Sequence, residues 1–139
     1  MRPSARAAVD TSVVVAAFAS WHEHHDVARA AIDHGPQLIE HCALECYSVL
    51  TRLPFPHRSP PELVLEFLLT RFPGDWLKME AADFRRFLRG LAQSGVTGGA
   101  VYDALIAVTA THCKVELISC DQRARATYAR YGIEAHFPS

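Results

Sequence analysis

Four acidic residues lie in or beside apolar runs of the sequence: Asp10, Glu45, Asp103 and Asp121. Asp10 is the clearest case, because Ala7 to Val9 lead into it and the run Val13 to Val15 follows after two residues. An ionised carboxylate that leaves water is costly unless a cation or several donors meet it. We therefore predict that the four acids converge on a divalent metal ion.

Electrostatic cost supports a metal at such a cluster. If four carboxylates lay about 5 Å apart, each like-charged pair would cost roughly 3 kcal/mol at an effective dielectric near 20, and six pairs about 20 kcal/mol. That exceeds the net stability of a typical domain, about 5–15 kcal/mol. Protons or metal ions must neutralise the cluster, and hard oxygen ligands favour Mg²⁺ or Mn²⁺ over zinc. A carboxylate-held Mg²⁺ that keeps several waters suits phosphodiester hydrolysis without a protein nucleophile.

A simpler interpretation exists for the acids taken singly. Asp103 and Asp121 stand at expected helix starts, where Asp is common as a cap. For Asp10 inside its apolar run that interpretation is weaker, and it is weaker again for all four together. Ser12 and Ser119 could add hydroxyl ligands or orient a bound water, although isolated serines are more often turn or cap groups.

Strand and helix patterns alternate along the chain and would carry these acids. We expect strands at 5–9, 37–42, 76–79, 115–120 and 133–137. Helices are expected at 13–18 (capped by Thr11 or Ser12), 24–34, 43–52 (with Glu45 in the first turn), 60–71 (capped by Ser59), 81–93, 101–112 and 122–131. Such alternation predicts an α/β fold with a mainly parallel sheet covered on both faces. The four acids then share the rim at the carboxyl ends of the strands, where ligands bind in such sheets.

Length and composition limit the number of domains and the class of protein. The chain has 139 residues, half of them apolar, which predicts a single domain over residues 1–139. A net charge of −1 excludes a globally basic surface for nucleic acid, so any RNA contact must be local. The four cysteines follow no disulfide or zinc spacing, and buried free thiols are expected. No apolar stretch has the length of a signal peptide or a membrane span, so we expect a soluble cytoplasmic protein that does not associate with a membrane.

The segments around the acids resemble a known family. Val9-Asp10-Thr11-Ser12, Glu45 within ALECYSVLTRLP, Asp103 within VYDALIAVTA and Asp121 within LISCDQRA are similar to PIN domains, specifically VapC-type toxins of bacterial toxin–antitoxin pairs. Family members often have Thr where Ser119 stands, and the hydroxyl is kept. The resemblance implies a three-layer α/β/α sandwich and an Mg²⁺- or Mn²⁺-dependent endoribonuclease acting on structured RNA such as tRNA or ribosomal RNA. It also implies inhibition by a VapB-like antitoxin and metal binding by Asp10, Glu45, Asp103 and Asp121.

Two further features bear on partners. Arg123 and Arg125 directly follow Asp121 and are the favoured RNA-phosphate contacts, although each could equally belong to a solvated helix face. The segment 62–72 is apolar nearly all round, so part of it is expected to meet another chain, either an antitoxin helix or a second copy in a homodimer. The alternative for this segment is a deeper core.

Three other functions can be weighed against the residues that each would require. His22, His24 and His25 near Trp21 could suggest a transition-metal site, but no cysteine lies near enough in sequence to complete a zinc pattern, and an exposed helix start is favoured. A non-enzymatic metal-dependent adhesion module would need Ser where Val14 stands. A phospho-accepting receiver domain would need a lysine near the end of the last strand, and the chain has none there.

Overall fold

A small parallel sheet forms the centre of the protein. The computed structural model describes residues 6–138, and so residue 5 of the expected first strand lies outside the described part. The strands β1 (Ala7–Val9), β2 (Gln37–Leu38) and β3 (Glu116–Ile118) pair in parallel in the order β2-β1-β3. Single parallel bridges, Ile39 with Leu77 and Ile118 with His136, extend the sheet at its two edges. The parallel sheet predicted from the alternating pattern is confirmed.

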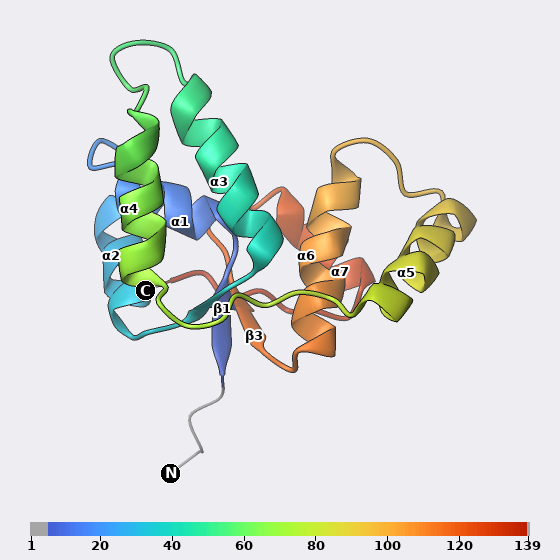
Figure 1. Cartoon of the computed structure of the whole chain (residues 1–139). Helices are drawn as coiled ribbons and strands as arrows, with labels where there is room; N and C mark the ends of the chain where they lie inside the picture. Colours follow the sequence, from blue (N-terminus) through green and yellow to red (C-terminus); the bar gives the residue numbers. More distant parts are fainter. Residues whose placement is uncertain (1–5, 139) are drawn as a thin grey trace.

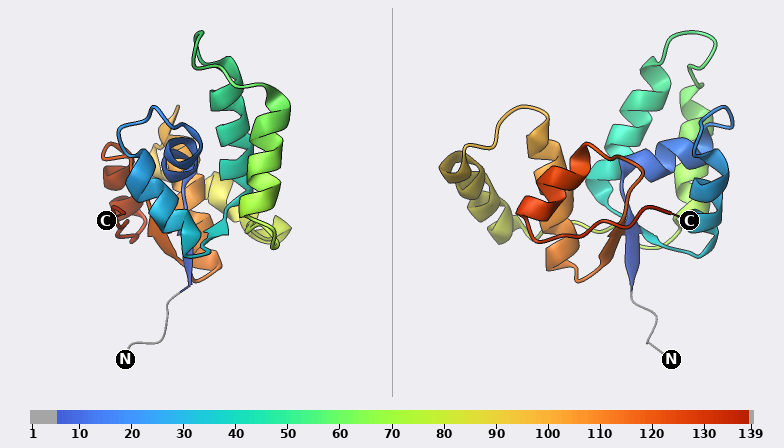
Figure 2. Two further views of the ribbon diagram at one scale, coloured as in Figure 1. Left: turned by 90° about the vertical axis from the view of Figure 1, so that its left-hand side faces the viewer. Right: turned by 180° about the vertical axis from the view of Figure 1, so that it is seen from behind.

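Helices cover both faces of this sheet. Their bounds are α1 Thr11–Phe18, α2 His25–Asp33, α3 Glu40–Arg52, α4 Pro61–Arg71, α5 Ala81–Ser94, α6 Ala100–His112 and α7 Ala124–Arg130. Figure 1 labels these helices, and Figure 2 shows α2 and α7 on one side of the strands and α3 and α4 on the other. The α/β/α sandwich implied by the family resemblance is therefore confirmed.

Several boundaries differ from the sequence-based expectation. Helix α1 is capped by Asp10, not by Thr11 or Ser12, because β1 already ends at Val9 and the Asp10 carboxylate reaches the Val13 N–H. The expected strands at 76–79 and 133–137 contribute only one bridge each. Helix α4 starts at Pro61 with Pro60 as its N-cap, and the Ser59 hydroxyl bonds the Pro60 carbonyl instead of capping the helix.

Two apolar cores of unequal size hold these elements. The main core joins the sheet to α1, α2, α3, α4, α6 and α7, with Leu38, Leu50 and Leu117 at its centre. The minor core joins α5 to α6 through Phe87, Leu91, Val96 and Ala104. In Figure 1, α5 accordingly lies at the edge of the molecule, beyond α6.

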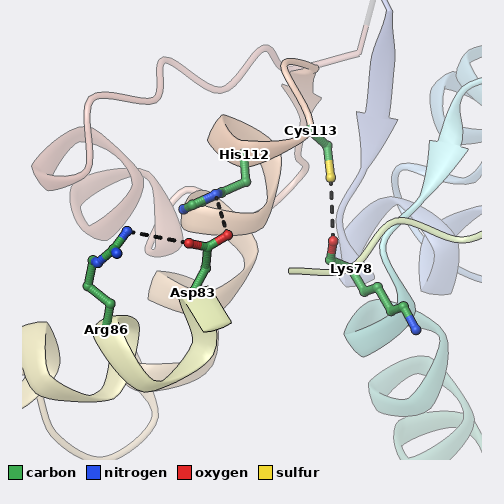
Figure 3. A network of polar contacts seen from close by, with 5 residues as sticks. All are labelled: Lys78, Asp83, Arg86, His112 and Cys113. Carbon is green, nitrogen blue, oxygen red and sulfur yellow. Dashed lines mark hydrogen bonds and ion pairs between the residues drawn. The ribbon is translucent and has the colours of Figure 1, made fainter. Parts of the chain in front are cut away.

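Polar contacts add to the attachment of α5. The Asp83 carboxylate lies 3.5 Å from His112 Nδ1 at the end of α6 and 3.4 Å from the Arg86 guanidinium (Figure 3). The Cys113 thiol donates to the Lys78 carbonyl just before α5, at 3.7 Å. These side chains lie on α5, the end of α6 and the adjoining segments, and none of them borders the acidic cavity described below.

The surface of α4 carries unburied leucines. Val64, Leu68 and Phe72 are buried, whereas Leu63, Leu65 and Leu69 are about half exposed, at 52%, 50% and 54%. The expectation that one helix could not bury this whole segment is confirmed. Cys42 and Cys46 are buried and all four thiols are free, but Cys113 and Cys120 are only half-buried. Within residues 6–138 we find no helix whose length and apolarity would let it cross a bilayer.

Candidate active site

The four acids singled out from the sequence line one cavity. This cavity has a volume of ≈520 Å³, and Asp10, Glu45, Asp103 and Asp121 all contribute to its wall. Asp10 directly follows β1, and Asp121 lies three residues after the end of β3. The strands β1 and β3 are neighbours in the sheet. Strand order reverses between these two strands, and parallel sheets bind ligands at such a point. A larger cavity of ≈650 Å³ near α2 contains none of the four acids.

Asp10 is the most deeply buried of the four, with 2% of its surface exposed. Its carboxylate accepts hydrogen bonds from the Ser12 hydroxyl at 2.5 Å, the Tyr128 hydroxyl at 2.7 Å and the Val13 N–H at 3.3 Å. Burial raises the pKa of Asp10, and the surrounding hydroxyls and the Val13 N–H act in the opposite direction. Burial and the Asp10 carboxylate also raise the pKa of Tyr128, which keeps that hydroxyl a donor.

Ser12 and Ser119 link the start of α1 to the loop after β3. Besides donating to Asp10, the Ser12 hydroxyl accepts the Cys120 N–H at 2.8 Å. The Ser119 hydroxyl lies 3.4 Å from that of Ser12 and accepts the Asp121 N–H at 3.0 Å. The two serines predicted as supporting hydroxyls therefore sit between Asp10 and Asp121.

Glu45 reaches the cavity from α3. Because α3 begins at Glu40, Glu45 lies in the second turn and not in the first turn as expected; the residues 40–42 assigned to a strand are already helical. Its carboxylate accepts the Thr11 hydroxyl at 2.5 Å and lies 4.0 Å from His41 Nε2. The His41 ring in turn stacks on Tyr102 at 5.3 Å, so Glu45 has one hydroxyl donor and one nearby imidazole.

Asp103 and Asp121 complete the acidic wall in different ways. Asp121 Oδ1 accepts the backbone N–H groups of Arg123 at 2.9 Å and Ala124 at 3.3 Å. These bonds lie at the start of α7, but the N-cap of that helix is Arg123 and not Asp121. Asp103 is half-buried in the first turn of α6, and no residue among 6–138 donates a hydrogen bond to its carboxylate. Burial, followed by the charges of Asp121, Glu45 and Asp10, raises the pKa of Asp103 to about 6.

The donor chemistry of this wall suits a hard divalent cation. Arg123 is the one Lys or Arg side chain among the described residues that line the cavity, so most of the negative charge has no protein cation opposite it. In residues 6–138, however, no three His, Cys, Asp or Glu side chains are grouped closely enough to coordinate an ion on their own. Mg²⁺ takes one or two carboxylates directly and keeps several waters, which fits acids that surround a cavity without closing on one point.

The remaining candidates and the residues missed from the sequence complete the site. Arg123 lines the acidic cavity, whereas Arg125 donates to the Ala135 carbonyl at 3.1 Å and lines a separate cavity. Sequence reasoning missed Tyr128 and the link from Thr11 to Glu45. Neither has a local signal, because Tyr128 is 118 positions from Asp10 and Thr11 is 34 from Glu45.

Comparison with known proteins assigns the family. Residues 7–130 match the PIN domain. Over 127 residues the chain is 46% identical to Ribonuclease VapC40 of Mycobacterium tuberculosis, covering 91% of this chain and 95% of the relative. It is 39% identical to Ribonuclease VapC27 of the same organism, covering 91% and 92%. The crystal structure of PAE2754 from Pyrobaculum aerophilum has the same fold, with a TM-score of 0.59, 22% identity and coverage of 92% and 97%. The chain belongs to the PIN-domain family, in its VapC group.

Proposed function

We propose that this protein is a divalent-metal-dependent endoribonuclease that acts as the toxin of a toxin–antitoxin pair, with residues 1–139 forming one PIN domain. The observation that carries the proposal is the single cavity to which Asp10, Glu45, Asp103 and Asp121, from four separate segments of the chain, all contribute. Relatives named Ribonuclease VapC at 46% and 39% identity support the reaction class.

Asp10, Glu45, Asp103 and Asp121 are the residues that we assign to Mg²⁺ or Mn²⁺ and to catalysis. When bound, the ion supplies a positive charge opposite the phosphate and lowers the pKa of water, which is the chemistry that phosphodiester hydrolysis needs. The hydrogen bonds from Ser12 and Tyr128 fix the Asp10 carboxylate before substrate arrives. Ser119 does the same for the backbone at Asp121. Preorganised charges of this kind lower the barrier because they need not rearrange during the reaction.

The substrate is RNA, cut in the loops of tRNA or ribosomal RNA, which places the activity in the cytoplasm. Unpaired loops are the parts of structured RNA that a protein can reach with its side chains. Arg123 is the first choice for a phosphate contact because it borders the acidic cavity. Arg125 is a weaker candidate, since its guanidinium already donates to the Ala135 carbonyl.

A VapB-like antitoxin neutralises the enzyme in this proposal, and the toxin forms a homodimer. The support is the pair Leu65 and Leu69, which lie about one helical turn apart on one face of α4 and are each about half exposed. Apolar residues gathered on a surface mark contacts with other chains. Light scattering measures the mass of the toxin alone and with its antitoxin, and so shows whether a second toxin copy or the antitoxin binds this surface. A Leu65→Ser, Leu69→Ser double variant should disrupt whichever complex uses this surface, and an unchanged mass in both measurements would contradict the assignment.

Incubation of the purified protein with total cellular RNA tests the enzymatic proposal. Cleavage is expected with Mg²⁺ or Mn²⁺, and EDTA should abolish it. Asp10→Asn and Asp103→Asn should each lower the rate by at least about 100-fold, since each removes a charged oxygen that no neighbouring group replaces. Asp75→Asn is the matched control, because Asp75 is an exposed acid outside the cavity. Equal cleavage by parent and Asp10→Asn or Asp103→Asn variants would overturn the proposal.

A further inference from the structure

A group of aromatic and imidazole rings adjoins the acidic cavity. His22 and His24, in the loop between α1 and α2, line the same cavity as the four acids. Trp21 stands beside His22, with 5.9 Å between ring centroids, and has 48% of its surface exposed. His57, from the loop between α3 and α4, lies 4.2 Å from the Trp21 ring. We call Trp21, His22, His24 and His57 the ring cluster.

The ring cluster is held in place by specific contacts. The His24 N–H donates to His22 Nδ1 at 3.0 Å, so a neutral His22 carries its hydrogen on Nε2. His25 Nδ1 bonds the Ala16 carbonyl at 2.8 Å and attaches the loop to α1. The Trp21 ring packs at 35° to the plane of His57, which joins two loops that are distant in sequence. These contacts therefore hold the exposed Trp21 ring in a defined position.

Trp21 differs from the other tryptophan in a way that core packing does not explain. Trp76 is half-buried, and its indole N–H donates to the Phe72 carbonyl at 3.0 Å. The Trp21 indole has no hydrogen-bond partner among residues 6–138.

Electrostatics indicate what kind of ligand the ring cluster would take. Five acids, the four named above and Glu23, and one arginine line the cavity, so without a bound cation the cavity wall repels the phosphates of RNA. Affinity for RNA must then come largely from contacts that do not depend on charge, or from cations away from the acids. Burial, followed by the charge of His24, lowers the pKa of His22, which favours the neutral ring. Arg58 is an exposed cation on the same loop as His57, and its Nε–H donates to the Leu53 carbonyl at 2.9 Å.

We propose that Trp21 and His22 form a stacking subsite for an unpaired RNA base beside the phosphate that is cleaved. Single-stranded RNA is recognised by stacking of splayed bases on aromatic and imidazole rings, and every base offers a face for this contact. The subsite rests on the proposed ribonuclease function, because it assumes that RNA enters the acidic cavity. It adds a substrate-binding role for the loop between α1 and α2.

Tryptophan fluorescence gives a direct test that does not depend on cleavage. The chain has two tryptophans, so Trp76→Phe leaves Trp21 as the only one, and Asp103→Asn is added to suppress cleavage. Titration with a single-stranded oligoribonucleotide should quench this fluorescence, and the matching duplex should quench it much less. In the Asp103→Asn protein, followed by filter binding, Trp21→Ala should weaken RNA binding roughly 5- to 150-fold, while Trp21→Phe should retain most of it.

Two exposed aromatic residues serve as controls. Phe84 on α5 is 43% exposed and lies outside the cavity, so Phe84→Ala should bind RNA like the parent. Tyr102, 52% exposed and stacked on His41, is the rival platform beside Asp103. If Tyr102→Ala weakens binding and Trp21→Ala does not, the proposal is overturned. Circular dichroism of each variant separates lost binding from lost folding, and Trp21→Phe tests the ring if Trp21→Ala does not fold.

Kinetics separate this subsite from the catalytic assignment. In the otherwise unchanged protein, Trp21→Ala should raise KM for a short RNA with little change in kcat, because the ring contacts substrate away from the reacting atoms. Quenching of Trp21 by RNA, together with no cleavage of RNA by the otherwise unchanged protein in Mg²⁺ or Mn²⁺, would support the subsite and contradict the proposed enzyme. Cleavage with unchanged KM in Trp21→Ala would support the enzyme and contradict the subsite.

Discussion

The two walls of the acidic cavity hold their carboxylates in opposite ways. On the hydrogen-bonded wall, Asp10 is buried, caps α1 and accepts three hydrogen bonds, two of them from the hydroxyls of Ser12 and Tyr128. On the open wall, Asp103 in α6 is half-buried, and its carboxylate receives no hydrogen bond from residues 6–138. The pKa of Asp103 rises to about 6 through burial and the charges of the other three acids.

This difference separates preorganisation from binding capacity. A carboxylate that caps a helix and accepts buried hydroxyls contributes to folding even when no ligand is present. A carboxylate without donors costs folding energy and gains a partner only when a cation arrives. We infer that Asp10 fixes the position of the site, and that Asp103 supplies charge that a metal would satisfy.

Alanine substitutions should separate the two walls most clearly. In EDTA, Asp10→Ala should lower the free energy of unfolding by about 2–4 kcal/mol, because it removes a helix cap and leaves the buried Tyr128 hydroxyl without an acceptor. Asp103→Ala should change it by less than about 1 kcal/mol, since relief of repulsion offsets the lost interaction with the α6 dipole. Urea unfolding measures both values. Equal destabilisation by the two variants would remove the distinction between the walls.

The hydrogen-bonded wall can also be weakened by removing the hydrogen bond that the Tyr128 hydroxyl donates to Asp10. Tyr128→Phe removes one donor to Asp10 with little change in shape and should cost about 1–3 kcal/mol in the same unfolding experiment. Tyr131→Phe is the matched control, because the Tyr131 hydroxyl has no hydrogen-bond partner among residues 6–138 and its loss should be nearly neutral. If the two variants are equally stable, the Tyr128 hydroxyl contributes nothing to the position of Asp10.

The acids of the cavity were easier to predict from the sequence than the groups that hold Asp10 in place. Acids in apolar runs at the ends of expected strands can be recognised locally, and the structure brings all four to one cavity. The partners of Asp10 cannot be recognised in this way. Tyr128 reaches Asp10 across 118 positions, and in the sequence it is one more apolar residue of an amphipathic helix.

The prediction of helix and strand boundaries was limited by a different factor. Asp10, Thr11 and Ser12 are all good capping residues, so the residue that caps α1 depends on where β1 ends, and pairing with β3 decides this. The expected edge strands at 76–79 and 133–137 form one bridge each, because pairing at a sheet edge depends on tertiary position more than on local propensity. The order along the chain of the seven helices and of the three strands that form is set by longer patterns and was predicted correctly.

The raised pKa of Asp103 on the open wall should appear in the pH dependence of stability. In Asp103 the folded pKa of about 6 lies above the ordinary value of 3.8, so between these values the folded protein binds more protons than the unfolded chain. This group therefore makes the protein less stable as pH rises from about 4 to about 6, and its contribution is constant above that. Solvent screening limits the effect to below about 1 kcal/mol, since Asp103 is half exposed.

Asp103→Asn provides the comparison for this prediction. The variant cannot ionise at this position, so in EDTA its Tm relative to that of the parent should be higher at about pH 8 than at about pH 4. The other acids titrate in both proteins, and their contribution largely cancels in the difference. Parallel Tm profiles would mean that Asp103 is ionised as easily in the folded protein as in the unfolded chain.

The smallest expected effect decides to which wall Glu45 belongs. Glu45 accepts one hydroxyl, from Thr11 at 2.5 Å, and is otherwise half exposed, so it is intermediate between Asp10 and Asp103. Thr11→Val keeps the shape and removes the donor, and we expect a loss of about 0.5–1 kcal/mol, less than for Tyr128→Phe, because solvent can replace the lost donor. Thr11→Ser, which retains a hydroxyl, is the control in the same urea titration. A loss as large as that of Tyr128→Phe would assign Glu45 to the hydrogen-bonded wall, and no loss would group it with Asp103 as a ligand that only a cation holds.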